Sequence, residues 1–215
     1  MAPMIDGSGS AAALRFAVIQ SRFNEAVTKH LLEGALEALR GAGAKDDAID
    51  VVSVPGAFEI PLIAAQLAKS RRYDAVVCLG AVIRGQTAHF EYISMAVSQG
   101  IARASYDYGV PVIFGVLTTD TEEQAEARAT PSHRGSAQKF RGGTLKKGRA
   151  WVGADDRCNK GYEAGKAAVE MANLMKRLDI ARGDLDIVRG EPVELSPRRG
   201  RPSRASGPTR QGKRP

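Results

Sequence analysis

Short apolar runs alternate with amphipathic stretches along this 215-residue chain, and this alternation limits its fold more than any other feature. Runs typical of strands lie at residues 14–19, 49–54, 75–83 and 112–117. Helical spacing predicts helices at 25–39, 59–69, 88–108, 121–129 and 162–178. Apolar strands that alternate with helices favour a parallel sheet covered on both faces. The sequence therefore predicts an α/β fold with a four-stranded parallel sheet flanked by helices on both faces.

Two expectations concern the helices themselves. Asn24 is the expected N-cap of the first helix, because its side chain can accept a hydrogen bond from a free N–H group of the first turn. The last helix should bury one apolar face, which comprises Ala164, Ala168, Met171, Ala172, Met175 and Leu178.

The formal net charge of +7 is concentrated in two segments. Residues 130–157 hold seven basic and two acidic side chains, and residues 189–215 hold eight and two, so the remaining chain has a net charge of −4. Both segments are polar, a composition that favours disorder. We therefore expect a flexible N-terminal segment at 1–13, a single domain at 14–180 interrupted by a basic polar insert at about 130–157, and a disordered basic tail at 189–215. Neither basic segment interleaves aromatic residues regularly, so specific nucleic-acid binding is not expected.

Several protein classes find no support in the sequence. Cys78 and Cys158 make neither a disulfide framework nor a metal site, and no histidine falls at metal-ligand spacing. The phosphate-loop and nucleophile-elbow motifs are absent. No apolar run reaches the ~20 residues of a membrane span, and residues 1–13 lack the features of a secretory signal. We expect a cytoplasmic protein that uses no metal or cofactor and contacts no membrane.

The segment after the third predicted strand carries the strongest functional signal. Gly85, Gln86 and Thr87 form a short loop between that strand and a helix that begins near His89. Ligands of open parallel sheets bind at the carboxyl ends of the strands, and N–H groups at a helix N-terminus favour phosphate. A histidine at that place titrates near neutral pH and can transfer a proton in either direction. These residues together predict a reaction site for a phosphate compound.

Aromatic and polar residues follow the other strands at the same edge of the sheet. Phe23 and Asn24 come after the first strand, and Ala57, Phe58 and Glu59 come after the second. Aromatic faces beside an amide and a carboxylate suit a flat heteroaromatic ring that carries a polyol. A plain structural alternative exists for each: the phenylalanines could lie in the core, and Glu59 could be a favourable charge in the first turn of a helix. Their common position favours the binding role.

Four motifs stand in order along the chain: Arg22-Phe23-Asn24; Val54-Pro55-Gly56-Ala57-Phe58-Glu59-Ile60-Pro61; Gly80-Ala81-Val82-Ile83-Arg84-Gly85 with Thr87-Ala88-His89-Phe90-Glu91-Tyr92; and Pro111-Val112-Ile113-Phe114-Gly115-Val116-Leu117-Thr118-Thr119. Together they closely resemble the 6,7-dimethyl-8-ribityllumazine synthase family, from about residue 14 to 129 and again at 159–178. The resemblance implies a three-layer, flavodoxin-like domain. It also implies a transferase that condenses 5-amino-6-(D-ribitylamino)uracil with 3,4-dihydroxy-2-butanone 4-phosphate, giving the lumazine, phosphate and water. This is the penultimate step of riboflavin biosynthesis, and the family uses no cofactor.

By position, the resemblance implies a role for each candidate residue. The ribitylaminouracil would be bound by Phe23, Asn24, Ala57, Phe58, Glu59, Val82, Ile83 and Phe114. The phosphate would be bound by Gly85, Gln86, Thr87, Arg128 and Lys160, and protons would be transferred by His89. Family sites lie between subunits of a homo-oligomer, so Phe114, Arg128 and Lys160 would come from a neighbour. Functional coupling to riboflavin synthase is also implied.

The connection between Arg128 and Lys160 departs from the family pattern. Thirty-one residues separate them here, where the family has a short Gly-rich connection. Either this segment is a loop that leaves Arg128 in place, which the flanking helical patterns favour, or Arg128 is displaced. In the second case the chain would be a weakly active or inactive oligomeric scaffold whose basic tails bind polyanions. Archaeal-type riboflavin synthases share the fold, but residues 56–59 and 84–89 favour the lumazine enzyme.

The long connection also bears on assembly. The family forms pentameric rings, and some members pack twelve rings into an icosahedral 60-mer. In the family, a longer connection at this place is associated with staying pentameric. We therefore expect a pentamer.

Overall fold

The computed structural model describes residues 4–130 and 159–183 of the chain. Its elements follow in the order β1 (Phe16–Ser21), α1 (Glu25–Gly41), η1 (Asp46–Ala48), β2 (Ile49–Val54), η2 (Ala57–Glu59), α2 (Ile60–Lys69), β3 (Ala75–Ile83), α3 (His89–Tyr108), β4 (Val112–Thr119), α4 (Glu122–Ala129) and α5 (Lys160–Gly183). The predicted basic tail, and the predicted insert apart from Thr130, lie outside the described residues.

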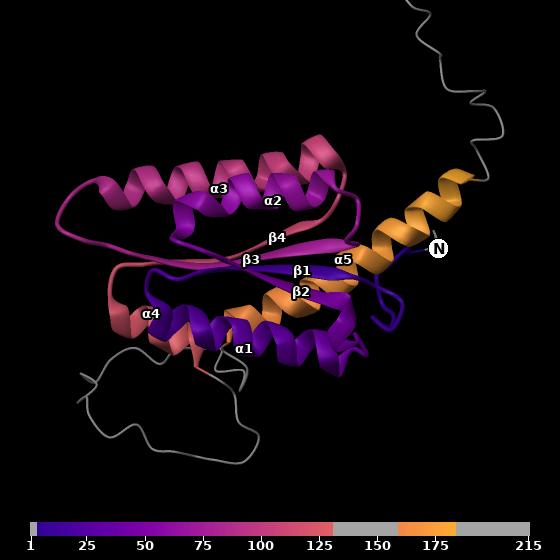
Figure 1. The fold of residues 1–215 in the computed structure, drawn as a ribbon, viewed down its shortest axis with the longest axis horizontal. Helices are drawn as coiled ribbons and strands as arrows, with labels where there is room; N and C mark the ends of the chain where they lie inside the picture. Colours follow the sequence, from indigo (N-terminus) through magenta and orange to yellow (C-terminus); the bar gives the residue numbers. More distant parts are fainter. Residues whose placement is uncertain (1–3, 131–158, 184–215) are drawn as a thin grey trace, which may run out of the picture.

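The four strands form one parallel sheet in the order β2-β1-β3-β4. Helices α2 and α3 cover one face, and α1, α4 and α5 cover the other (Figure 1). The predicted fold class is confirmed. Because all four strands run in the same direction, their carboxyl ends meet at one edge of the sheet, where ligands of such folds bind.

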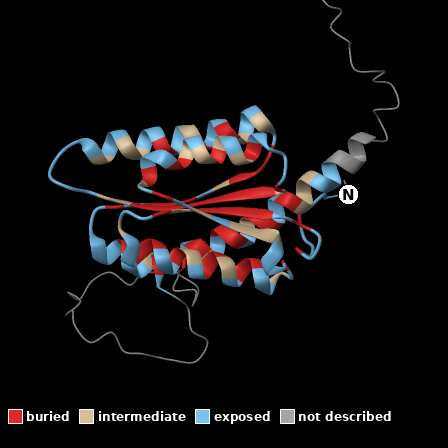
Figure 2. Cartoon of the chain, viewed as in Figure 1, coloured by how far each residue is buried: buried red, intermediate tan, exposed pale blue. Residues whose placement is uncertain are grey.

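Alternating strand residues divide the core into two clusters. Phe16 and Val18 of β1 pack toward α1 and α5, whereas Ala17 and Ile19 pack toward α2 and α3. Strand β3 is apolar on both sides and is buried from Ala75 to Ala81, as expected for a central parallel strand. Figure 2 shows the buried strands between two helical layers that are exposed on their outer sides. The sheet therefore forms a well-packed support for the loops at its edge.

Helix α5 packs closely on α1 because glycines face the contact. A Cβ atom on Gly161 would collide with the carbonyl group of Leu31, and one on Gly165 would lie 2.8 Å from the carbonyl oxygen of Ala35. Such close approach favours small residues between the helices.

The predicted apolar face of α5 is partly wrong. Its alanines are buried as predicted, namely Ala164, Ala168 and Ala172, but Met171 and Leu178 are 37% and 38% exposed, and Val169 is buried instead. The buried stripe is centred on the glycines and alanines that touch α1, so Met171 lies at its margin. Toward its C-terminal end, α5 runs past the end of the sheet (Figure 1).

The described part of the N-terminal segment, residues 4–13, lies against α5. Arg177 donates hydrogen bonds to the backbone oxygens of Asp6 at 2.8 Å and Ser8 at 2.5 Å. Ala11 is fully buried in the cluster beneath α1 and α5. Within the described ranges, no helix is long and apolar enough to span a membrane.

Candidate active site

A cavity of about 380 Å³ opens at the carboxyl ends of β1, β2 and β3. Nine of the predicted site residues line it, namely Phe23, Ala57, Phe58, Glu59, Val82, Ile83, Gly85, Thr87 and His89. They come from three segments that are distant in sequence, at or just after the ends of β1, β2 and β3, and the parallel sheet brings them to one edge. A cavity of this size fits a small-molecule ligand.

Two phenylalanines that line this cavity have exposed side chains. Phe23 is 70% exposed and Phe58 is 59% exposed, so neither is a core residue. Burying an aromatic ring against a flat ligand would recover the apolar contact that these side chains lack in the free chain. Their exposure favours the stacking role over the structural alternative.

Asn24 occupies the predicted N-cap position but does not cap α1 with its side chain. Its backbone is left-handed, with φ 61° and ψ 46°, a conformation that asparagine tolerates better than most residues. The side-chain amide donates instead to the carbonyl oxygen of Ala81 at 2.9 Å. The expected cap is therefore wrong, because the amide connects the loop after β1 to β3 and is not free to turn back onto its own helix.

Glu59 lies at the end of η2, immediately before α2. Its carboxylate accepts a hydrogen bond from the N–H group of Gly56 at 2.9 Å, which orients it within the tight turn. A side chain at residue 56 would crowd this carboxylate, since a Cβ there would lie 3.1 Å from Glu59 Oε2. Glu59 thus stabilises the turn and also lines the cavity.

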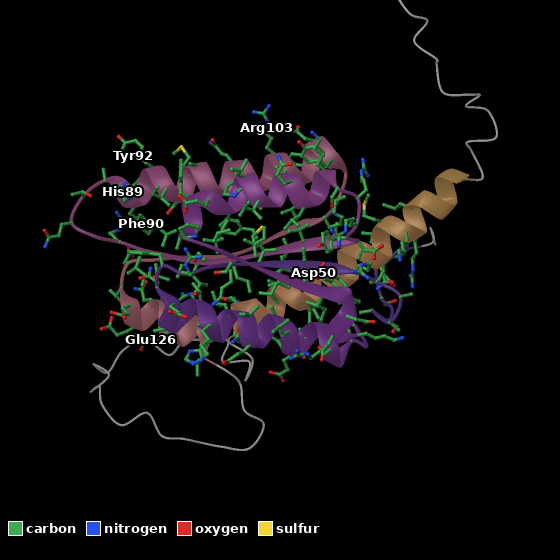
Figure 3. The ribbon with its side chains drawn as sticks, viewed as in Figure 1. Asp50, His89, Phe90, Tyr92, Arg103 and Glu126 are labelled. Atoms are coloured by element: carbon green, nitrogen blue, oxygen red, sulfur yellow. The ribbon has the colours of Figure 1, made fainter. Side chains whose placement is uncertain are left out.

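The predicted phosphate loop joins β3 to α3. Gly85 and Thr87 line the cavity, and His89, the first residue of the 20-residue helix α3, is exposed beside them (Figure 3). Backbone N–H groups and the positive end of the helix dipole make a helix N-terminus suitable for an anion. An exposed imidazole at the cavity can exchange protons with a bound ligand. Gln86 is exposed and is not among the residues that line the cavity.

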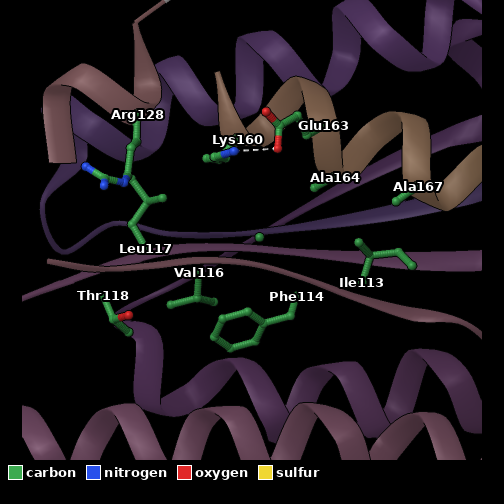
Figure 4. Close-up of a pocket in the computed structure, with 11 residues that line it drawn as sticks. Ile113, Phe114, Val116, Leu117, Thr118, Arg128, Lys160, Glu163, Ala164 and Ala167 are labelled. Atoms are coloured by element: carbon green, nitrogen blue, oxygen red, sulfur yellow. Dashed lines mark hydrogen bonds and ion pairs between the residues drawn. The ribbon is translucent and has the colours of Figure 1, made fainter. Parts of the chain in front are cut away.

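Phe114, Arg128 and Lys160 line a separate hollow of about 390 Å³ on the edge strand β4 (Figure 4). Phe114 is 44% exposed and lies on the opposite side of β4 from the two cations in this view. Arg128 donates to the carbonyl oxygen of Gln124 at 3.1 Å, and Lys160 pairs with Glu163 at 2.7 Å. A single chain therefore separates the predicted site residues into two groups.

Asn159 joins the two chain ends on either side of residues 131–158. Its buried side-chain amide donates to the carbonyl oxygens of Ala129 at 2.7 Å and His30 at 2.9 Å, and its oxygen accepts from the N–H group of Tyr162 at 3.0 Å. The end of α4 is thereby fixed to the start of α5. Arg128 remains on its helix and lines the same hollow as Lys160.

No group of three or more metal-ligating side chains occurs in residues 4–130 and 159–183. Cys78 is buried in β3, and burial raises the pKa of its thiol far above the ordinary value. The thiol is therefore protonated at neutral pH and is out of reach of the cavity's ligand.

The sheet order defines a flavodoxin-like α/β protein, and its cavity lies at the carboxyl edge, where this class binds small molecules. Residues 13–176 match the family model of 6,7-dimethyl-8-ribityllumazine synthase. The chain is also 48% identical over 174 residues to the 6,7-dimethyl-8-ribityllumazine synthase of Clostridium kluyveri, an alignment that covers 81% of this chain and 97% of that protein. The chain belongs to the 6,7-dimethyl-8-ribityllumazine synthase family.

Proposed function

We propose that this chain condenses 5-amino-6-(D-ribitylamino)uracil with 3,4-dihydroxy-2-butanone 4-phosphate at the cavity beside β1, β2 and β3. The products are 6,7-dimethyl-8-ribityllumazine, phosphate and water, and the reaction is the penultimate step of riboflavin biosynthesis. The observation that carries this proposal is the convergence of two exposed phenylalanines, an oriented carboxylate, a helix N-terminus and a histidine on one cavity.

The cavity offers a distinct surface to each part of the ribitylaminouracil. Phe23 would stack on the pyrimidine, and backbone groups of Val82 and Ile83 would bind its edge. Ala57, Phe58 and Glu59 would contact the ribityl chain, with the fixed Glu59 carboxylate accepting hydrogen bonds from its hydroxyl groups. Asn24 would join this pocket through the part of its amide that Ala81 does not engage.

The second substrate would be held by its phosphate. The Gly85–Gln86–Thr87 loop and the start of α3 supply N–H donors. The amine of one substrate adds to the ketone of the other with loss of water, phosphate is eliminated, and the ring closes with loss of a second water. Each stage moves a proton, which His89 would transfer, and the remaining contribution is orientation of the two substrates.

The hollow on β4 would complete the site from a neighbouring subunit. It carries Phe114, Arg128 and Lys160, which the chain's own cavity does not contain. Arg128 can bind a phosphate with two parallel hydrogen bonds, and Lys160 adds a second positive charge. A homo-oligomer would bring the two groups of site residues together across an interface, and we propose a pentameric ring.

Two further assignments follow from the same reaction. The phosphorylated substrate is charged and does not cross a membrane freely, so we place the reaction in the cytoplasm. The lumazine is the substrate of the last biosynthetic step, which supports coupling to riboflavin synthase.

The test is turnover of the two substrates by the purified full-length chain, followed by the absorbance of the lumazine. Product formation supports the proposal, and no product above the uncatalysed reaction contradicts it. The alternative is an inactive scaffold whose basic tail binds polyanions. It predicts no turnover, together with salt-sensitive polyanion binding that is lost when the chain is stopped after Arg189.

A further inference from the structure

The geometry points to Arg84 as a positioning residue: it fixes the phosphate loop and His89 against the end of β4 without touching the substrate itself. This inference rests on the proposed function for the identity of the ligand. Arg84 is the first residue after β3, and it does not line either cavity described above.

Arg84 is attached to two different elements. Its backbone N–H donates to the carbonyl oxygen of Thr119 at 2.9 Å and so continues the pairing of β3 with β4. Its Nε donates to Asp120 Oδ1 at 2.7 Å, just beyond β4. A terminal guanidinium nitrogen donates to Glu91 Oε1 in the first turn of α3. The guanidinium carbon lies 4.3 Å from the centre of the Phe90 ring, within the range of a cation–π contact.

These contacts hold both ends of the segment 84–91 in place. The segment contains every predicted phosphate-loop residue and His89. Residues 84–89 are exposed, and the bond between the His89 N–H group and Thr87 Oγ1 is long, at 3.5 Å. Space around Gly85 is open, since a Cβ there would meet nothing within 4 Å. The loop thus has little packing of its own, and the Arg84 contacts hold its two ends together.

The charges around Arg84 argue against a direct contact with phosphate. Two carboxylates already occupy its guanidinium. The hydrogen bond from Arg84 is the largest cause that lowers the pKa of Glu91 below its ordinary value, so the pair is fully ionised at neutral pH. An incoming phosphate would have to displace a carboxylate from a guanidinium that is already paired.

The variants that test this inference change one partner each. Arg84→Met keeps the length of the side chain but removes its charge and hydrogen bonds. Glu91→Gln and Asp120→Asn keep Arg84 and weaken its two contacts. The control is Arg103→Met. Arg103 pairs with Asp107 at 3.2 Å farther along α3, the helix that also carries Glu91, and it lies away from the cavity (Figure 3).

We expect Arg84→Met to raise the KM for the butanone phosphate and to lower kcat, each about tenfold, as small misplacement of binding and reacting groups does. The KM for the ribitylaminouracil should change less than about twofold, because Arg84 contacts none of the residues assigned to that substrate. Glu91→Gln and Asp120→Asn should act in the same direction with smaller effects. The double variant Arg84→Met with Glu91→Gln should be no worse than Arg84→Met alone, and Arg103→Met should match the wild type.

Titration calorimetry with inorganic phosphate provides a readout that does not depend on turnover. Weaker phosphate binding in Arg84→Met, Glu91→Gln and Asp120→Asn supports the inference. Tighter binding in the two carboxylate variants would overturn it, because a released Arg84 would then be a phosphate ligand. An equal rise of both KM values with a lowered melting temperature would also overturn it. A wild-type chain that binds phosphate but does not turn over refutes the proposed function alone, whereas one that binds no phosphate refutes both.

Discussion

At the scale of single residues, His89 stands where a proton-transfer group must stand, exposed beside the cavity at the first residue of α3. We predict that His89→Ala lowers kcat by roughly 10²–10⁴-fold, the usual contribution of a general acid–base group. Because the amine and the ketone also react without a catalyst, we expect the decrease in kcat to lie near the lower end of this range. Steady-state kinetics on the purified variant measure it, with the exposed α1 residue His30 changed to Ala as the matched control.

Full turnover in His89→Ala would show that the assignment is wrong. Loss of wild-type activity on treatment with a chelator would refute the separate prediction that the reaction needs no metal.

Arg128 provides the second prediction at this scale. Arg128→Lys should raise the KM for the butanone phosphate and lower kcat, since lysine keeps the charge but cannot form two parallel hydrogen bonds to phosphate. The KM for the ribitylaminouracil should change less. Kinetics in which each substrate is varied in turn measure the difference, and equal weakening toward both would indicate a general disturbance of the α4 region instead.

Single residues also show where sequence reasoning succeeds and where it stops. The edge position of Phe23 and Phe58 could be predicted, because each follows a recognisable strand. The Asn24 contact with Ala81 could not, because the two lie 57 positions apart. Arg84 was not among the predicted site residues for the same reason: its partner Asp120 is 36 positions away, and only the pairing of β3 with β4 brings them together.

At the scale of elements, the joint between α4 and α5 carries a prediction about Asn159. Asn159→Asp keeps an oxygen that can accept from Tyr162 but loses both donor contacts, to His30 and Ala129. Losing the buried contact to the Ala129 carbonyl and the part-buried contact to the His30 carbonyl should cost about 1–3 kcal/mol of folding stability. The KM for the butanone phosphate should also rise, because Arg128 and Lys160 flank this joint. Denaturant unfolding and kinetics measure the two effects, and in an Arg128→Ala background Asn159→Asp should raise this KM less, because only Lys160 is then left to be displaced.

Gly34 tests the same joint from α1. In a helix interior Gly→Ala ordinarily stabilises by up to ~1 kcal/mol. A Cβ on Gly34, however, would collide with the side-chain amide of Asn159. We therefore expect Gly34→Ala to destabilise the chain and to reproduce the kinetic defect of Asn159→Asp. A stabilised Gly34→Ala variant with normal kinetics would contradict the role of the joint.

The elements themselves were predicted closely, because each strand is an apolar run and each helix has a regular apolar face. The predicted first strand, 14–19, is displaced to Phe16–Ser21, and the fourth continues to Thr119. The strand pairing extends into these polar residues, which hydropathy alone does not mark. Only the family resemblance implied that Phe114 and Phe23 lie in different parts of one chain. Their separation depends on β4 being the edge strand, and hydropathy does not give the order of the strands.

At the scale of the whole molecule, the division of the site predicts assembly. The chain's own cavity lacks Phe114, Arg128 and Lys160, so we predict that activity requires a neighbour. Interfaces that place one surface against a different surface of the next copy close into rings under rotation. The family ring is a pentamer, and the open question is whether twelve rings associate further into a 60-mer.

The segment between α4 and α5 decides this question. Asn159 bonds to the carbonyl oxygen of Ala129, so the described residues on the two sides of 131–158 meet at one point. This segment is more than twenty residues longer than the family connection and has seven basic against two acidic side chains over residues 130–157. In the family this place lies near contacts between pentamers. Several copies of this segment at a contact between pentamers would oppose the contact, both by their bulk and by repulsion between their like charges.

We therefore predict free pentamers, or at most pairs of them, at physiological ionic strength. Light scattering coupled to size exclusion measures the mass of the particle directly. Replacing residues 131–157 with a short Gly-containing link provides the matched variant, and it should shift the population toward larger particles if bulk and charge prevent association. Because repulsion between like charges is screened by salt, high ionic strength should favour association of the wild-type rings, though less than removal of the segment does. A wild-type particle of about sixty subunits would refute the steric and electrostatic argument, whereas a monomer would contradict the shared active site itself.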